Sequence, residues 1–408
     1  MTGVAAGRIR TAAAQDAIVA AERSPSGAPR LWVEALQLTN FRNYPSVSLR
    51  VGPAPVVLWG ANGAGKTNLL EALSLLTSGQ GLRRAPYPEL AGPGGGTWAV
   101  WARLWSRSGP ISLGTGLAAE PDEAGRAGRV VRIDGQPQPI TALDQHVELI
   151  WITPALDGLF TGAASERRRF LDRLVACFDP GYRVRVGQFE RAMQQRNRLL
   201  AEQVGDAARF EAFERSMAET GVAIAAARVA LVAELASAID RRRRAGGPSA
   251  FPWAELAVSG LLESELATRA AVDVEDDYCR LLAGARERDR AAGRTRDGPH
   301  RSDLMVGHGA KEMPAKICST GEQKALLIGL ILAHADLVSQ QHGGAAPLLL
   351  LDEITAHLDA ARRLALFDEI IGLGCQAWMS GTDPQAFAGL GQRAQFLRIE
   401  EGGVGAGL

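Results

Sequence analysis

The chain has 408 residues, 46% of them hydrophobic, so its length allows two or three globular domains with substantial cores. Its 45 Lys and Arg balance 45 Asp and Glu, which excludes a global basic field that would attract nucleic acid. Four widely spaced cysteines without a C-x-x-C pair argue against a zinc site or a disulfide framework and favour a reducing compartment. Without a run of about eighteen apolar residues, no membrane span is predicted.

The first part of the chain predicts an extension followed by strands. Residues 1–30 are rich in Ala, Gly, Arg and Ser and lack the apolar stretch of a signal peptide, so we predict a disordered extension. Residues 31–38 and 47–51 predict two strands, and residues 56–59 predict a third that is short and buried. Residues 69–76 predict a helix.

A glycine-rich loop separates that short strand from that helix. Its sequence, Gly60-Ala61-Asn62-Gly63-Ala64-Gly65-Lys66-Thr67, fits the P-loop pattern G-x-x-x-x-G-K-[ST] in full. The glycines let successive backbone N–H groups point at one anion, and the helix N-terminus adds its partial positive charge. Lys66 is expected to reach the β- and γ-phosphates of ATP, and the Thr67 hydroxyl to hold Mg²⁺. A chance glycine-rich turn is the alternative, and the flanking strand and helix argue against it.

Three more strands and a long helical stretch follow. The segments 97–105, 111–117 and 129–133 predict an antiparallel β layer beside the nucleotide core, with a turn at Asp134-Gly135. After a strand at residues 149–153, the pattern becomes helical and charged, which predicts an inserted helical lobe. Within it, residues 165–245 and 274–292 are expected to be helical, and residues 255–266 extended or mixed. The predicted domains are a disordered extension at 1–30, the first half of a nucleotide-binding lobe at 31–155, the helical lobe at 156–295 and the second half of the nucleotide-binding lobe at 296–408.

The second half of the nucleotide-binding lobe carries a Walker B pattern. Residues 347–351 form an apolar strand that ends in Asp352 and Glu353. Beside the P-loop strand, such a strand would deliver Asp352 to the Mg²⁺ shell. Glu353 would then orient or deprotonate the attacking water. Many buried strands end in an acid, so this pattern gains its weight from the complete P-loop.

A possible second anion site lies upstream, where Ser319-Thr320-Gly321-Glu322 precedes an apolar helix at residues 324–337. An ordinary N-cap is the alternative for this stretch alone. The order of the motifs along the chain, namely the P-loop, then this Ser-Thr-Gly-Glu stretch, then Asp352 and the segment 354–359, resembles that of the ATP-binding-cassette (ABC) class of ATPases. The resemblance implies an α/β fold: a P-loop ABC-type ATPase head with an antiparallel β layer and an inserted helical lobe. It also implies that two subunits close on two ATPs, with Ser319 and Gly321 acting on the partner's nucleotide.

Further segments are similar to the RecF family: residues 38–44, 162–172, 195–200 and 298–304. This resemblance implies that Arg42 approaches the nucleotide phosphates. It also implies a cytoplasmic, nucleoid-associated DNA repair protein that acts with RecO and RecR, promotes RecA loading at single-strand gaps and supports the SOS response. Three positions depart from the pattern: Thr320 stands where transporter signatures have Gly, residues 379–383 contain no His, and residues 154–157 lack an acid directly after the Pro.

Two segments are basic although the chain is neutral. Residues 165–198 carry nine Arg and four acids, and residues 280–301 carry seven Arg and three acids. Such segments favour a surface that follows the DNA backbone without reading base sequence, although any single Arg can equally belong to a solvated helix face.

Three other classes of protein compete with this interpretation. A transporter-type ABC subunit usually keeps its P-loop and Walker B closer together than Lys66 and Asp352. SMC or Rad50 proteins insert a much longer coiled coil than residues 188–244 allow. A phosphotransferase with a small-molecule acceptor would need neither Ser319 and Gly321 nor the segment 354–359, and it would respond to metabolites instead of DNA.

Overall fold

The computed structural model describes residues 30–119, 128–202, 207–244 and 250–406, so the predicted extension lies outside the described residues apart from Arg30. Residue contacts divide the chain into two compact units. Unit 1 comprises the residues up to 139, 339–350 and those from 370 onwards, and unit 2 comprises 140–338 and 351–369. The predicted domain boundaries divide the chain in another way and stay a prediction.

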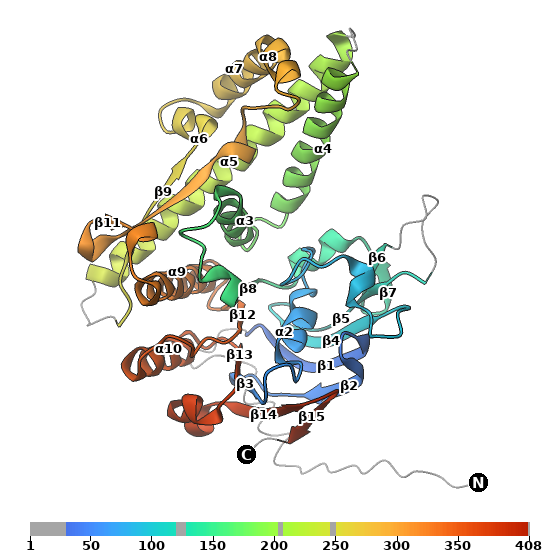
Figure 1. Ribbon diagram of the computed structural model, residues 1–408, viewed down its shortest axis with the longest axis vertical. Helices are drawn as coiled ribbons and strands as arrows, with labels where there is room; N and C mark the ends of the chain where they lie inside the picture. The colour runs from blue at the N-terminus through green and yellow to red at the C-terminus, as the bar shows by residue number, and fades with distance from the viewer. Residues whose placement is uncertain (1–29, 120–127, 203–206, 245–249, 407–408) are drawn as a thin grey trace. The chain divides into compact units, whose positions relative to one another are not determined.

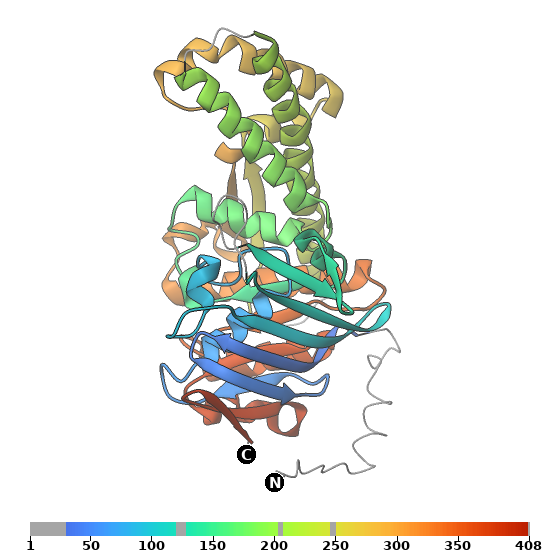
Figure 2. The same ribbon diagram turned by 90° about the vertical axis from the view of Figure 1, so that its right-hand side faces the viewer.

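The first sheet of unit 1 is the antiparallel layer that the sequence predicts (Figure 2). Its strand order is β2-β1-β4-β5-β6-β7, and every neighbouring pair is antiparallel. Apolar side chains on one face of β4 are buried, as the period of two requires for a half-covered sheet. The strands are β1 (Trp32–Phe41), β2 (Tyr44–Arg50), β4 (Ala99–Ser106), β5 (Gly109–Leu117), β6 (Arg129–Ile133) and β7 (Gln136–Gln138).

The second sheet of unit 1 holds the short apolar strand before the P-loop. That strand, β3, is paired in parallel with β13 on one side and β14 on the other. Within this unit the order is β15-β14-β3-β13-β12, and the helix after the loop, α2, begins at Lys66. The elements are β3 (Val56–Trp59), α2 (Lys66–Ser74), η1 (Tyr87–Leu90), β12 (Leu348–Leu351), β13 (Ala377–Gly381), η7 (Pro384–Arg393), β14 (Gln395–Glu400) and β15 (Gly403–Ala406).

Unit 2 contains the predicted helical stretch, divided into three helices. The chain turns near Pro180 and Gly181, after which α4 and α5 run alongside each other (Figures 1 and 2). The helices here are α3 (Ala164–Val175), α4 (Tyr182–Ala201), α5 (Ala207–Arg244), α6 (Leu261–Leu266), α7 (Ala271–Gly284), α8 (Arg286–Ala291), α9 (Thr320–Gln341) and α10 (Ala360–Leu373), the last two reaching into unit 1.

Helix α5 is long and apolar enough to pass a length and hydropathy test for a membrane span. However, half of its most apolar window is buried within the protein, and α5 packs on α4 and α7. It also carries the buried ionic side chains of Glu214 and Arg228. Both features are those of a core helix in the helical lobe.

The remaining strands of unit 2 are short. The mixed character expected for residues 255–266 is confirmed, because β9 is followed directly by α6. Strands β9, β10 and β11 form an antiparallel sheet in the order β11-β10-β9. The strands and 3₁₀ turns are β8 (Leu149–Ile152), β9 (Ala254–Ser259), β10 (Asp303–His308), β11 (Met313–Pro314), η2 (Ile140–Gln145), η3 (Pro154–Leu156), η4 (Pro299–Arg301), η5 (Gly309–Lys311) and η6 (Ala315–Ile317).

Candidate nucleotide site

The P-loop of unit 1 has a backbone that needs glycine at two places. Gly60 has φ 153°, and a Cβ built there would lie 2.3 Å from the carbonyl oxygen of Ile399. Gly65 has φ 115°, and a Cβ there would lie 2.5 Å from Asn43 Nδ2 and 2.6 Å from the Tyr44 hydroxyl. Since side chains are excluded by both conformation and contact, the loop keeps its backbone close to whatever it binds.

The Lys66 side chain lies inside the curve of the P-loop backbone. Its side chain is almost fully buried, and Nζ donates hydrogen bonds of 2.8 Å to the carbonyl oxygens of Gly60 and Ala61. The residue before it, Gly65, caps α2 without a side-chain hydrogen bond, so the positive end of the helix faces the loop. The ammonium group and the helix dipole together favour an anion at this loop, and binding of a phosphate there stays a prediction.

The residues that follow β1 contact the P-loop through hydrogen bonds and packing. Asn43 Nδ2 donates to the carbonyl oxygen of Ala64 at 3.0 Å, and Asn68 Nδ2 donates to Asn43 Oδ1 at 2.7 Å. Tyr44 is fully buried beside Gly65, and burial raises the pKa of its phenol. Sequence reasoning did not give Asn43 and Tyr44 a role, because their contact with the P-loop exists only in the folded chain.

Arg42, which the family resemblance assigns to the phosphates, is bound to a carboxylate of the P-loop helix. Its Nε and Nη2 donate to the two oxygens of Glu71 at 2.9 and 3.0 Å. Arg83 donates to the same carboxylate at 2.8 Å and to Asn68 at 2.6 Å. The buried Glu71 carboxylate carries one negative charge and pairs with both guanidinium groups. The three side chains together therefore leave a net positive charge beside the P-loop helix. Phosphate contact by Arg42 stays a prediction.

A pocket of about 530 Å³ opens beside the P-loop, in the size range of small-molecule sites. Its wall opposite the loop comes from the end of β14 and from Thr382, which lies in the segment without a predicted role. The Arg398 guanidinium lies over the Trp59 ring, 5.5 Å from the centroid, and Arg398 Nε pairs with Glu400 at 3.1 Å. Nothing in the sequence near residue 398 signals this contact, because parallel pairing of β14 with β3 creates it.

Asp352 and Glu353 belong to unit 2, whereas Lys66 and Thr67 belong to unit 1. The Asp352 side chain is buried, and its backbone N–H donates to the Ile152 carbonyl oxygen at 2.9 Å. Glu353 is exposed and has φ 48°, a left-handed conformation that turns the chain sharply after β12. The Mg²⁺ site that Thr67 and Asp352 would share therefore stays a prediction.

Ser319 stands at the N-cap of α9, where its carbonyl oxygen accepts from the Gln323 N–H at 2.9 Å, and it donates to the Glu322 side chain. The backbone N–H and the hydroxyl of Ser319 donate to Glu322 Oε2 at 3.0 and 2.9 Å, so the Glu322 carboxylate supplies the acceptor half of a capping box. Lys311, from the turn η5, forms an ion pair with the other oxygen of Glu322. A Cβ added at Gly321 would meet nothing within 4 Å. Ser319 thus occupies the N-cap position, as the N-cap interpretation expects, and the space around Gly321 is open.

The carboxyl of Glu322 should titrate unusually low. The Lys311 ammonium, then the bonds from Ser319, lower the pKa of this carboxyl to about 2. A depressed folded-state pKa means that the bonds of Glu322 with Lys311 and Ser319 stabilise the start of α9 above about pH 4 and that this contribution is lost as the pH falls towards 2. We expect Lys311→Gln to raise the pKa of Glu322 towards its usual value, as measured by NMR titration of labelled glutamate. Lys316→Gln, an exposed lysine nearby, is the control, and an unchanged titration in Lys311→Gln would contradict the assignment.

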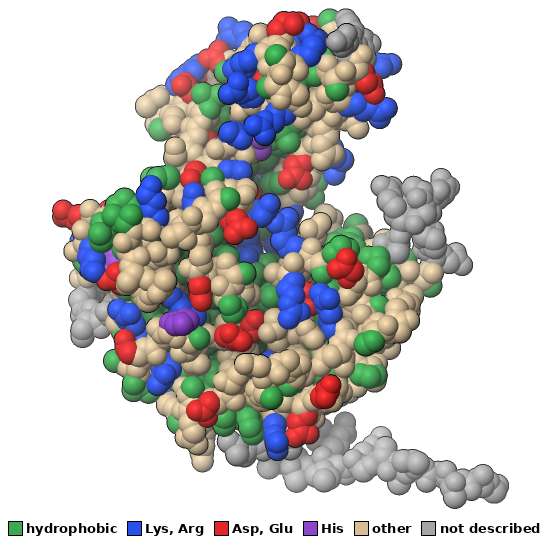
Figure 3. Space-filling model, viewed as in Figure 1, with side chains coloured by type: hydrophobic (Ala, Val, Ile, Leu, Met, Phe, Trp, Pro, Cys, Tyr) green, Lys and Arg blue, Asp and Glu red, His purple; other side chains and the backbone are tan. Residues whose placement is uncertain are grey.

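The two basic segments expose less free charge than their composition predicts. Arg196 is fully buried, Arg167 is paired with Asp303, and Arg183 with Asp144. On the face shown in Figure 3, Lys and Arg side chains over α7 and α8 are interspersed with Asp and Glu. The arginines that fold inward are paired with acids, as the alternative for single arginines predicts, because a buried guanidinium needs an anionic partner. A phosphate-tracking surface formed by the others stays a prediction.

The fold and the site together define a class. A P-loop strand and helix, a β-rich layer and a helical lobe are those of ABC-type ATPase heads, and solved structures agree. The chain matches the structure of the recombination mediator protein RecF-ATPrS in the RecFOR pathway with a TM-score of 0.78 and 20% identity, covering 95% of this chain and 100% of that one. An Smc head domain from Pyrococcus furiosus matches with a TM-score of 0.50 and 14% identity over 92% of this chain and 95% of that one.

Curated relatives then identify the family. The DNA replication and repair protein RecF of Mesorhizobium japonicum is 53% identical over 375 residues, which are 91% of this chain and 97% of the relative. RecF of Allorhizobium ampelinum is 52% identical over 377 residues, 92% of this chain and 99% of the relative. The chain belongs to the RecF family. No protein-family model matches it.

Proposed function

We propose that this protein acts in DNA replication and recombinational repair as an ATP-dependent homodimer that closes on DNA. The observation that carries the proposal is the P-loop of unit 1, in which Lys66 occupies a cradle of carbonyls that phosphate oxygens would replace. The names of the curated relatives and the ATP-bound state of the solved RecF structures support the choice of DNA repair and of ATP.

ATP binding in this scheme is shared between two copies. The P-loop, including Gly60, Gly63 and Gly65, holds the triphosphate in one copy. Ser319 and Gly321 of the other copy grip its γ-phosphate, and the open space at Gly321 supports this role, because no neighbour among the described residues lies within 4 Å of a Cβ added there. A monomer would therefore hydrolyse ATP poorly.

Hydrolysis uses residues of this chain in distinct roles. Glu353 accepts a proton from the attacking water, and Lys66 stabilises charge on the transferred phosphoryl group. The Thr67 hydroxyl and the Asp352 carboxylate are oxygen donors of the kind that Mg²⁺ prefers, and the bound ion would neutralise phosphate charge. Turnover then reopens the dimer and releases DNA.

DNA binding in this scheme is to the backbone and is not sequence-specific, so it weakens steeply with salt. The family implies RecO and RecR as partners, RecA loading at single-strand gaps as the outcome, and the nucleoid in the cytoplasm as the place of action. The RecF protein of the solved RecF-ATPrS structure is a recombination mediator in the RecFOR pathway, which supports these partners.

Sedimentation of Glu353→Gln tests the proposal. We expect the wild type to dimerise with ATP and to return to monomers as ATP is consumed, since hydrolysis reopens the dimer. The variant binds ATP without hydrolysing it and should remain dimeric, with DNA increasing the dimer fraction. Glu190→Gln, an exposed glutamate on α4, should behave as the wild type. Monomers of both proteins under every condition would refute the dimer scheme.

A further inference from the structure

Two segments that the sequence singles out, but to which no role has been given, meet in unit 2. They are the start of α3 and the segment around η4 and β10. Arg167 donates from Nε and Nη2 to the two oxygens of Asp303, both at 2.8 Å. Arg168 donates to the carbonyl oxygen of Ser302 at 2.6 Å. These contacts fix the first turn of α3 against the start of β10.

The carboxylates of this cluster already have cationic or hydroxyl partners. Asp303 is held by Arg167, and Asp172 accepts from Arg228 at 2.8 and 3.1 Å. Glu263 accepts from the Ser302 hydroxyl at 2.5 Å and lies 3.6 Å from Arg228. No carboxylate among them is paired with Arg168 or Arg301.

Arg168 and Arg301 consequently carry positive charge without an anionic partner in the part of the chain that the structure describes. Arg168 is half-buried and donates to a neutral carbonyl, which belongs to the residue next to Arg301. Arg301 is exposed. Burial, followed by the charge of Arg228, lowers the pKa of Arg168, and burial also lowers the pKa of His300, the neighbour of Arg301. The charge of Arg301 also lowers the pKa of Arg168, whereas Asp172 and Asp303 act in the opposite direction, so the Arg168 and Arg301 guanidinium groups are close enough to repel each other.

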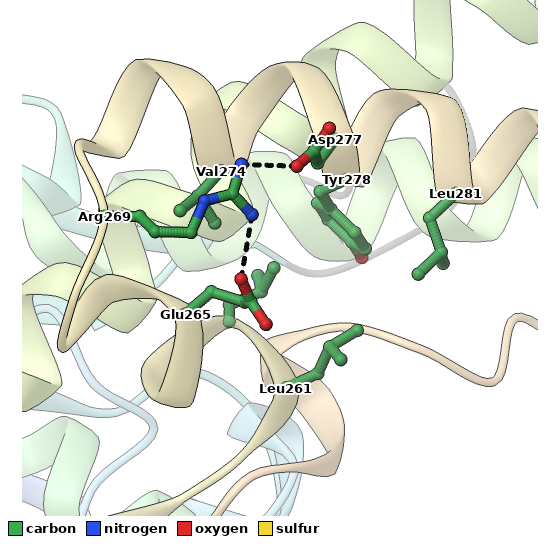
Figure 4. Close-up of a pocket in the computed structure, with 8 residues that line it drawn as sticks. Leu261, Glu265, Arg269, Val274, Asp277, Tyr278 and Leu281 are labelled. Carbon is green, nitrogen blue, oxygen red and sulfur yellow. Dashed lines mark hydrogen bonds and ion pairs between the residues drawn. The ribbon is translucent and has the colours of Figure 1, made fainter.

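Arg269, in the same unit, is a comparison case, because carboxylates neutralise the charge of its guanidinium group. In the pocket between α6 and α7, it donates to Glu265 at 2.8 Å and to Asp277 at 2.5 Å (Figure 4). Two carboxylates outweigh its charge, so this pocket offers no anion site. The pair at Arg168 and Arg301 has the opposite balance.

We propose that Arg168 and Arg301 together bind one phosphate of the DNA backbone. The planar guanidinium fork matches phosphate oxygens in two-point contacts, and a rigid anchor such as the Arg167–Asp303 bridge reduces the ordering cost of binding. Contact with a backbone phosphate positions a protein on DNA without specifying sequence, as the proposed function requires. The inference rests on the proposed DNA binding and assigns it a place.

The test is the salt dependence of DNA binding by the full chain with the slowly hydrolysed analogue ATPγS, measured by fluorescence anisotropy of a labelled gapped duplex. Arg301→Ala removes an exposed side chain, so the fold should persist. We expect several-fold weaker binding at low salt and a slope of log affinity against log salt that is less steep by up to about 0.9, the value for complete loss of one phosphate contact, because Arg168 remains beside the phosphate. Arg301→Lys keeps the charge and should keep the slope.

Arg169→Ala is the matched control. Arg169 is the next residue on α3, is exposed and lies 3.9 Å from Glu166, and its loss should leave the slope unchanged. An unchanged slope in Arg301→Ala, or an equal loss in Arg169→Ala, would overturn the assignment while leaving DNA binding intact. Weaker ATPγS binding with unchanged DNA binding would instead assign the pair to nucleotide and equally refute it. Failure of the wild type to bind DNA would refute the proposed function itself.

Discussion

Lys66→Ala should weaken ATP binding severely. In the structure the ammonium group donates two hydrogen bonds within the loop, and in the proposed complex it exchanges these for phosphate oxygens. Hydrogen bonds to charged groups contribute about 1.5–3 kcal/mol each, so the loss of two lowers ATP affinity about 100-fold or more. Isothermal titration calorimetry with ATP and Mg²⁺ measures this directly.

The control for Lys66→Ala separates binding from folding. The carbonyls of Gly60 and Ala61 lose their donor in the variant, so its melting temperature should be recorded beside the affinity. Lys316→Ala removes an exposed lysine and should bind ATP as the wild type does. Wild-type affinity in a folded Lys66→Ala protein would show that the loop does not hold the triphosphate.

Arg196→Met should cause the largest loss of stability among the arginine variants. The guanidinium is fully buried and donates to Glu214 at 3.0 Å, Asp289 at 2.8 Å and Thr295 at 2.8 Å. Its removal leaves two buried carboxylates with less compensation, and breaking a buried pair in this way costs about 3–5 kcal/mol. Urea denaturation followed by the helical circular dichroism signal gives the change in free energy of unfolding.

Arg198→Met provides the comparison, two residues further along α4. Arg198 is exposed and pairs with Glu202 one helical turn away at 2.7 Å. Water and salt screen an exposed pair of this kind, so its loss should leave the variant nearly as stable as the wild type. Equal stability of the two variants would show that the buried network around Arg196 is not a structural anchor of the helical lobe.

Most elements of the fold could be predicted from patterns of residues that are neighbours in the sequence. The P-loop and its flanks were predicted because strand, glycines and helix are neighbours in sequence, and the antiparallel strands because each alternates and ends in turn residues, such as Asp134 and Gly135, both with positive φ. Helix α9 begins at Thr320, earlier than the predicted Lys324, because the bonds between Ser319 and Glu322 extend its first turn.

Contacts between distant segments account for what sequence reasoning missed. Arg42 was assigned to phosphate from its motif, but Glu71 lies within reach only once β1 meets α2. Arg196 counted as surface charge because it lies in a basic helix, and its partner Asp289 is 93 residues away. The part of the pocket beside the P-loop that Arg398 lines likewise depends on sheet pairing. A sequence pattern identifies which residues carry charge, whereas tertiary packing decides which charges remain available.

ATP turnover of an equimolar mixture of Lys66→Ala and Ser319→Arg tests most directly whether two copies share one nucleotide. Each variant alone should be inactive. A mixed dimer has one intact site, in which the P-loop of the Ser319→Arg chain meets the unchanged signature of the other. With half of the dimers mixed, activity should recover to at most about one quarter of the wild type. Activity no higher than that of the separate variants would contradict a site built from two subunits.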